Sequence, residues 1–337
     1  MTRFVLRRLA IVPLLLLGIV TIAFVISRLM PSDPIAAIVG QRSMNNPEVV
    51  AAARERWGLD SNVFVQYVSY VGRLLTGDMG TSFQTRASVS ADLAERLPAT
   101  LELSLLALVI GALGGIVLGV ISASRKDRFA DSAARVFALL GSSLPIFWTG
   151  LILLFVFYAQ LGIVPGPGRL SARVDPPPHV TGFYTIDSLV AGNVPLFVDA
   201  WAHLLLPAFV LAWGLMGTIS RLVRAAMLDE LHSDYVRTVR AKGIAETAVM
   251  RRHVLRNSLT PVVTVVGFAF GALLMGAVLV EQIFSWNGIG SYAVEAARTL
   301  DYPAINGVTL LGGVIFLLAS LATDLVYAAI DPRVRLA

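Results

Sequence analysis

The stretch LELSLLALVIGALGGIVLGV (residues 101–120) contains twenty residues and a single charged side chain, Glu102, near its start. A helix of about 20 apolar residues is the length that crosses the ~30 Å hydrocarbon core of a bilayer. Lipid offers no hydrogen-bond partners to backbone N–H and C=O groups, so a chain segment inside it must be helical. The stretch therefore predicts a membrane-spanning helix.

The composition extends this prediction to the whole chain. Of 337 residues, 56% are hydrophobic and only 15% are charged, whereas about a quarter of the residues are charged in soluble domains. We therefore expect an all-α polytopic membrane protein with six transmembrane helices. Its predicted spans are residues 9–30, 100–124, 135–163, 202–222, 259–283 and 306–330.

The first span follows basic residues, as the apolar core of a signal peptide does. Its own apolar core, LAIVPLLLLGIVTIAFVIS (residues 9–27), is longer than the 7–15 residues typical of a cleaved signal. We expect this span to be retained. The chain then divides into an N-terminal span (1–30), an outer helical segment (31–98), a five-helix core (99–330) and a tail (331–337).

Six spans place both termini on one side of the membrane. With the N-terminus in the cytoplasm, 17 of the 27 Lys and Arg residues lie on the cytoplasmic side, many of them in the loop 223–258. The other cations are spread over much longer outer segments. This asymmetry is the positive-inside pattern, so the net charge of +5 indicates topology and not nucleic-acid binding.

The outer segment 31–98 is predicted to contain two helices. Asn46 is a candidate N-cap followed by Pro47, and the stretch NVFVQYVSYVGRLLTG (62–77) has apolar residues at helical spacing. These helices either contact an extracytoplasmic partner or pack on the ends of the spans. A second outer loop, about 164–200, is rich in proline and is expected to be irregular.

Several kinds of chemistry are excluded by the sequence. The chain has no cysteine and only two lysines, Lys126 and Lys242, neither of which follows a glycine. A phosphate-binding P-loop, a thiolate nucleophile and a zinc–thiolate site are therefore absent. The common zinc-protease and esterase signatures are absent too. We expect no enzyme activity, no metal site and no cofactor in this chain.

Few ionisable residues lie within the spans. Glu102, His203 and Glu281 are near span ends, and Asp324 lies deeper in the last one. Intramembrane charge often marks an ion path, so an ion-coupled secondary carrier is one alternative function. A scaffold or an intramembrane enzyme is another, although no catalytic constellation supports it. Glycines four residues apart, at 111, 115 and 119, predict a helix-packing or dimer face.

The stretch DYVRTVRAKG (234–243) lies in the largest cytoplasmic loop. Asp234 is a candidate N-cap and Gly243 a candidate residue for ending a helix of about two turns. Tyr235 and Val239 lie on one side of this helix, and Arg237 lies on the other. So short a helix is marginal in water by itself and must be stabilised by packing.

This loop resembles that of binding-protein-dependent ABC importer permeases, and specifically the first permease subunit of the dipeptide/oligopeptide/nickel group. The resemblance covers nearly the whole chain. It departs from the usual pattern at Val239, Asn287 and Ser320. The matching stretches are DYVRTVRAKG (234–243), RRHVLRNSLTPVVT (251–264), MPSDPIAAIVG (30–40), GDMGTSF (77–83), RLPATLELSLLA (96–107), SLPIFWTGLIL (143–153), EQIFSWNGIG (281–290), RTLDYP (298–303) and DPRVRL (331–336).

The resemblance implies a type I ABC importer permease fold in a bacterial inner membrane. It implies a homologous second permease, two cytoplasmic ATP-binding subunits that hold ATP and Mg²⁺, and a periplasmic or lipid-anchored substrate-binding protein. Peptides are the implied cargo, with nickel chelates, glutathione, opines or glycosides as alternatives. Structural or gating candidates are Glu281, Asp301 and Asp324. The implied ATPase-coupling residues are Asp234, Tyr235, Arg237, Thr238, Arg240, Ala241, Lys242 and Gly243.

Overall fold

The computed structural model describes residues 2–29, 46–48, 50–51 and 62–330. Within these ranges the regular elements are helices, and one isolated antiparallel bridge joins Thr81 to Ser88. The all-α prediction is confirmed. The helices are α1 (Thr2–Leu29), α4 (Val63–Leu75), α5 (Val89–Ser124), α6 (Phe129–Ser143), α7 (Ile146–Leu154), the π-helical η2 (Phe155–Gln160), α8 (Tyr184–Val190), α9 (Val194–Leu231), α10 (Asp234–Ala241), α11 (Glu246–Ala248), the π-helical η3 (Val249–Val254), α12 (Leu255–Ser258), α13 (Thr260–Phe284), α14 (Ile289–Thr299) and α15 (Tyr302–Ile330).

The chain divides into two compact units. The first comprises Met1–Pro98 and Asn287–Leu318, and the second comprises Ala99–Trp286 and Ala319–Ala337. Helices α5 and α15 therefore contribute residues to both units. Each unit has a buried apolar core of its own.

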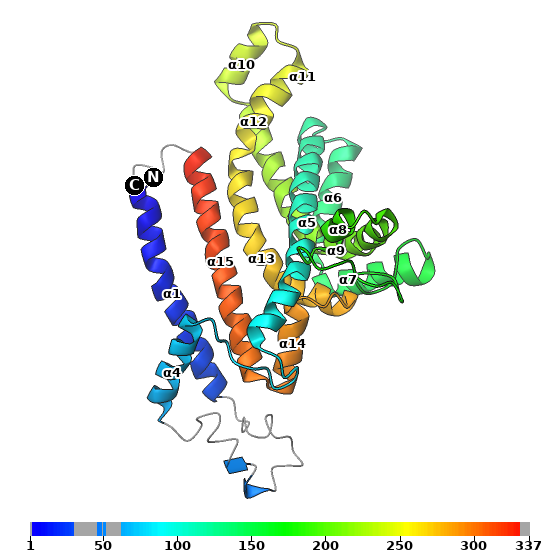
Figure 1. Cartoon of the computed structure of the whole chain (residues 1–337). Coiled ribbons are helices and arrows are strands. Elements are labelled where there is room, and N and C mark those ends of the chain that lie inside the picture. The colour runs from blue at the N-terminus through cyan, green and yellow to red at the C-terminus, as the bar shows by residue number, and fades with distance from the viewer. Residues whose placement is uncertain (1, 30–45, 49, 52–61, 331–337) are drawn as a thin grey trace. The chain divides into compact units, whose positions relative to one another are not determined.

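Helix α9 is the central element of the second unit. The side chain of Asn193 caps its N-terminus by accepting a hydrogen bond from the Leu196 N–H (3.1 Å), and a proline occupies its first turn. Leu204, Ala208 and Leu211 of α9 are buried against α5 and α13. Figure 1 shows α6 lying along the same helix, in agreement with the extensive contact between the two.

The predicted glycine pattern packs α5 on α9. A Cβ atom at Gly111, Gly115 or Gly119 would lie within 3.2 Å of a backbone carbonyl oxygen of α9. Such small residues let helix backbones approach closely. Of the two roles predicted for this pattern, packing within the chain is the one observed.

The predicted third span, residues 135–163, is not one straight helix. Helices α6 and α7 with η2 meet at an angle of 110°. Leu144 has an extended backbone (φ −81°, ψ 138°) and precedes Pro145. Proline disfavours helical conformation in the residue before it and cannot donate a backbone hydrogen bond, so the helix breaks here.

The first unit joins elements from both ends of the sequence. Val89 and Leu93 of α5 are buried against Ile289, Tyr292 and other residues of α14 and α15. In the outer segment, Asn62 caps α4 by accepting a hydrogen bond from Phe64 N (2.9 Å). Asn46 likewise accepts from Glu48 N, which confirms the predicted start of the preceding helix. Residues 49 and 52–61, which the prediction also covered, lie outside the described residues.

Among the described residues, four helices are long and apolar enough to cross a membrane, or five if the bent pair is counted as one span. The four are α5, α9, α13 and residues Tyr302–Leu321 of α15. Helix α1 adds a shorter apolar stretch, Ile11–Val25. The total of six spans stays a prediction.

The close contact between α6 and α9 gives a test of the fold. A Cβ at Gly217 would lie 2.3 Å from the Ala138 carbonyl oxygen, whereas a Cβ at Gly18 would have nothing within 4 Å. We expect Gly217→Ala to destabilise the protein by about 1–3 kcal/mol, because backbone must move to accept the methyl group. Gly18→Ala should be neutral or slightly stabilising. Thermal unfolding in detergent measures both, and equal stability of the two variants would contradict this packing.

Candidate functional site

The charged stretch 234–243 forms α10 and the turn that follows it. The N-cap is Ser233 (φ −72°, ψ 150°), so the prediction of Asp234 as N-cap is wrong by one residue. Asp234 already has a helical backbone, and its carboxylate contacts Arg237 at 3.3 Å. Gly243 ends the helix as predicted, with φ +73°, and its N–H donates to the Arg240 carbonyl (2.9 Å).

One side of α10 is held in the core of the second unit. Val236 is fully buried among residues of α9, η3 and α13, and Tyr235 and Val239 are partly buried beside it. The remaining predicted coupling residues are exposed on the other side. They are Asp234, Arg237, Thr238, Arg240, Ala241, Lys242 and Gly243.

Tyr235 links α10 to two other helices. Its hydroxyl donates to a carboxylate oxygen of Glu230, in the last turn of α9. The Asn257 amide of α12 donates to the same hydroxyl oxygen at 3.1 Å. Burial, followed by the hydrogen bond to Glu230, raises the pKa of Tyr235 above its usual value, so the phenol stays neutral.

Arg240 is paired within its own chain. Its Nε and NH2 groups donate to the two carboxylate oxygens of Glu246 at 3.0 and 2.6 Å, a bidentate geometry. The hydrogen bonds from Arg240 lower the pKa of Glu246 below its usual value. Sequence analysis did not identify Glu246, Glu230 or Asn257, because their partners lie on other elements.

The loop 223–258 is more helical than predicted. Helix α9 continues to Leu231, and helical segments run from Glu246 to Ser258. In Figure 1, α10 and α11 lie at the end of α9 and α12. The exposed side of α10 is thus presented by a short, braced helix and not by a flexible loop.

Glu281 and Glu102 lie in a second polar region of the same unit. Glu281 is fully buried and accepts a hydrogen bond from the Thr100 hydroxyl (2.6 Å). Glu102 accepts from the backbone and hydroxyl of Thr185 and forms an ion pair of 2.7 Å with Arg169. The Arg169 guanidinium also lies over the ring of Tyr184. Each buried carboxylate therefore has a partner, as burial of charge requires.

Asp301 belongs to the first unit. Its side chain is buried and accepts hydrogen bonds from the Ser82 hydroxyl and from the N–H groups of Gln84 and Ala304. It therefore joins the GDMGTSF segment to the corner between α14 and α15. Asp324 belongs to α15, but its side chain lies outside the described residues.

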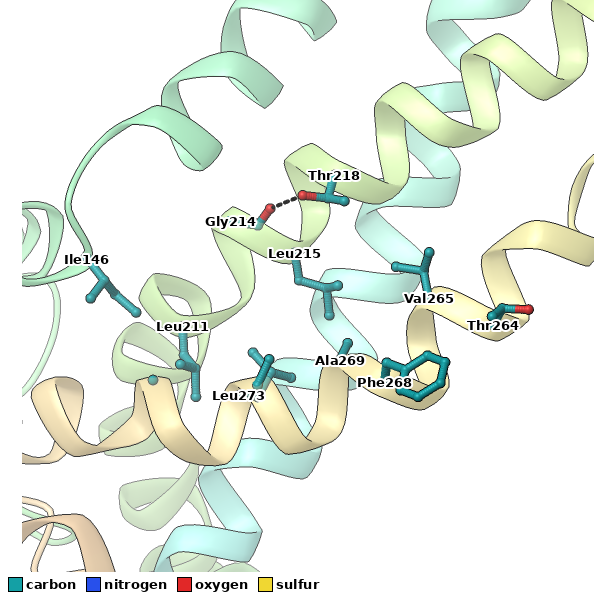
Figure 2. A pocket seen from close by; sticks show the side chains of 12 residues that line it. Ile146, Leu211, Gly214, Leu215, Thr218, Thr264, Val265, Phe268, Ala269 and Leu273 are labelled. Atoms are coloured by element: carbon teal, nitrogen blue, oxygen red, sulfur yellow. Dashed lines mark hydrogen bonds between the residues drawn. The ribbon is translucent and has the colours of Figure 1, made fainter. Parts of the chain in front are cut away.

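A mostly apolar cavity of about 490 Å³ lies in the second unit between α9, α13 and the start of α7. Figure 2 shows Leu211 and Leu215 of α9 opposite Leu273 and Ala269 of α13, and Phe268 also lines the cavity. The Thr218 hydroxyl is satisfied by the Gly214 carbonyl at 3.2 Å. A neighbouring, more polar cavity of about 260 Å³ shares several of the lining residues and adds Ser142 and Thr149.

Known proteins resemble this chain over nearly its full length. A model of the binding-protein-dependent transport system inner membrane component matches residues 115–336, and the corresponding N-terminal model matches residues 1–104. The probable D,D-dipeptide transport system permease protein DdpB of Escherichia coli (strain K12) is 42% identical over 95% of this chain and 94% of its own. The di/tripeptide permease DppB of Pseudomonas aeruginosa is 41% identical over 99% of each chain. A solved structure of the MetNI methionine ABC transporter covers 69% of this chain and 93% of its own, with 16% identity and a TM-score of 0.49.

Asp301 gives a test of the buried polar contacts. Asp301→Ala would leave three donors without this acceptor: the buried Ser82 hydroxyl, the buried Ala304 N–H and the partly buried Gln84 N–H. The cost is about 1–3 kcal/mol for each buried donor that finds no other partner. We expect a clear loss of thermal stability and faster proteolysis in the 77–88 region. Asp78→Ala is the matched control, because Asp78 is exposed and accepts only one local hydrogen bond, from Gly80 N. A loss as large in the control would contradict the structural role of Asp301.

Proposed function

Since this chain belongs to the binding-protein-dependent family of inner membrane transport components, as the permease subunit of an ABC importer, we propose that it takes up di- and oligopeptides by alternating access. The names of its relatives, which are permeases for dipeptides and tripeptides, support the cargo. Nickel chelates, glutathione, opines and glycosides are the alternative cargoes.

The proposed assembly supplies what this chain lacks. A homologous second permease would form the other half of the pathway, and two ATP-binding subunits would hold ATP and Mg²⁺ in the cytoplasm. A periplasmic or lipid-anchored binding protein would deliver the peptide. Both termini of this chain would be cytoplasmic, because that orientation places most Lys and Arg residues inside.

The observation that carries the coupling proposal is the braced geometry of α10. Its exposed side would dock in a cleft of an ATP-binding subunit, and its buried side is fixed to α9 by Val236 and Tyr235. Because α10 is hydrogen-bonded to both α9 and α12, a displacement of α10 would also move these two helices. A shift of the equilibrium between the inward-open and outward-open states from 1:99 to 99:1 requires about 5.5 kcal/mol of differential binding. ATP-driven closure of the partner subunits would provide this free energy.

The structure changes which cations we assign to docking. Arg240 is engaged by Glu246, so its proposed role is to stiffen the turn. We assign Lys242 and Arg237 to acidic or carbonyl groups of the partner. The contact of Arg237 with Asp234 is a single exposed one at 3.3 Å, unlike the bidentate pair of Arg240. The peptide pathway would run between the two permeases and be lined by the second to fifth predicted spans. Helices α7, α9 and α13, which belong to three of these spans, surround the cavity of about 490 Å³, so we assign this cavity to the pathway.

Gly243 gives the main test of this function. Its φ of +73° is left-handed, and a Cβ there would meet no atom within 4 Å, so conformation and not space restricts this position. Asparagine tolerates this conformation and a β-branched residue does not. We expect Gly243→Val to reduce ATP-dependent uptake of a labelled dipeptide at least about tenfold, whereas Gly243→Asn retains most of it.

The assay uses vesicles that contain the permeases, the ATP-binding subunits and the binding protein. Uptake without nucleotide, or by this chain alone, would contradict the importer assignment. Equal uptake by the valine and asparagine variants would contradict only the role of the turn after α10.

A cross-linking experiment tests docking directly. The chain has no native cysteine, so Lys242→Cys introduces the only thiol. We expect it to cross-link to a cysteine placed in the cleft of an ATP-binding subunit, with a yield that changes when ATP is added. Ser69→Cys, on the outer segment in the proposed topology, is the control and should give no cross-link. If the cysteine at position 242 forms no cross-link either with or without ATP, docking through this surface is refuted.

A further inference from the structure

Helix α4 has an apolar surface larger than its packing within the chain uses. Successive residues of a helix are 100° apart, which places Phe64, Val68 and Leu75 on one narrow stripe. These side chains are 71%, 53% and 85% exposed. Ser69 and Arg73 lie on the opposite, polar side of the helix. The helix therefore has one packed face, one free apolar face and one polar face.

The packed face of α4 contacts α1. The rings of Tyr67 and Tyr70 lie 5.4 and 5.9 Å from the ring of Phe24. The Thr21 hydroxyl donates to the Leu17 carbonyl, so in its 2.7 Å hydrogen bond with Tyr67 the tyrosine is the donor. Burial raises the pKa of the Tyr70 phenol to about 12, which keeps it neutral in this contact.

This contact fixes the depth of α4. Thr21 and Phe24 both lie in Ile11–Val25, the apolar stretch of α1. Ile22 and Val25, on the same turns of α1, are 60% and 45% exposed, as expected of side chains that face lipid. A helix that packs on this stretch lies at the level of the bilayer and not in the water beyond it.

We propose that the free apolar face of α4, formed by Phe64, Val68 and Leu75, is inserted in the interfacial layer of the membrane lipid. Its polar face, with Ser69 and Arg73, then faces water, as in an amphipathic helix that lies in the plane of the interface. Tyrosines are favoured at this level because their rings are apolar and their hydroxyls are polar. The stretch of α1 on which α4 packs also has exposed apolar side chains, Ile22 and Val25, so lipid is the occupant that we assign to both surfaces.

The consequence is an anchor for the outer segment. The chain before α5 would be attached to the bilayer surface at α4, on the side where the C-terminal half of α1 emerges. The assignment of that side to the outer leaflet rests on the proposed function and topology. The proposed contact of α4 with lipid does not depend on either of them.

The test uses single cysteines in the cysteine-free chain, purified with the subunits that accompany it. Phe64→Cys, Val68→Cys and Leu75→Cys place a fluorescent label on the free apolar face, and Ser69→Cys places it on the polar face. All four positions are exposed, so the substitutions leave the packing on α1 intact. Each labelled protein is reconstituted in phosphatidylcholine vesicles with and without bromine atoms on the acyl chains, and is also titrated with aqueous iodide.

We expect the bromolipid to quench the three apolar-face labels at least about threefold more strongly than the Ser69 label. Iodide should quench the Ser69 label more strongly than the apolar-face labels. Strong iodide quenching at all four positions would overturn the proposal, because the face would then be in water. Protection of the apolar-face labels from both quenchers would also overturn it, since a protein would then cover the face. Transport activity is read separately, so a failed importer assignment and a failed lipid contact are distinguishable.

Discussion

The close approach of backbones along α9 is the constraint on which the second unit depends. Glycines of α5 meet carbonyl oxygens of α9, and Gly217 of α9 meets the Ala138 carbonyl of α6. In lipid there is little hydrophobic gain from helix association, so dispersion contacts at short range must hold helices together. The positions of these glycines therefore determine how closely α5, α6 and α9 pack.

The same helix connects the apolar core to the charged surface. One buried cluster begins at Ala123 and Ile219, continues through Val223 and Met227, and ends at Val236 of α10. Beyond this cluster, Tyr235 is hydrogen-bonded to Glu230 and Arg240 to Glu246. An eight-residue helix that would be marginal in water is stabilised here by burial on one side and by hydrogen bonds at both ends. This rigidity is what the proposed coupling role requires.

Buried charge in this protein is consistently compensated within the described residues. Glu102 is paired with Arg169, and Asp131 is paired with Arg224 at 3.0 Å and with the Ser122 hydroxyl. Asp301 is held by three hydrogen-bond donors. Each of these carboxylates thus has hydrogen-bond or ion-pair partners within the fold. A chain that moved ions by itself would be expected to present ionisable groups along an open path, which the contacts of these residues do not provide.

The sequence by itself determined the properties that depend on neighbouring residues and on the solvent. Apolar stretches long enough to cross lipid must be helical, and residues such as Asn46 and Gly243 mark helix ends because each satisfies local backbone groups. The order of motifs also indicated the family. These features require no knowledge of which distant segments meet.

Only the tertiary structure decided the interactions between distant segments. It showed that the helix bends at Pro145, that Arg240 is engaged by Glu246, and that Glu102 is paired with Arg169. It also divided the apolar surface of α4, predicted as one face, into a part packed on α1 and a part left free. A helical pattern indicates which residues are apolar, but the partner of each depends on the packing of segments that are far apart in the chain.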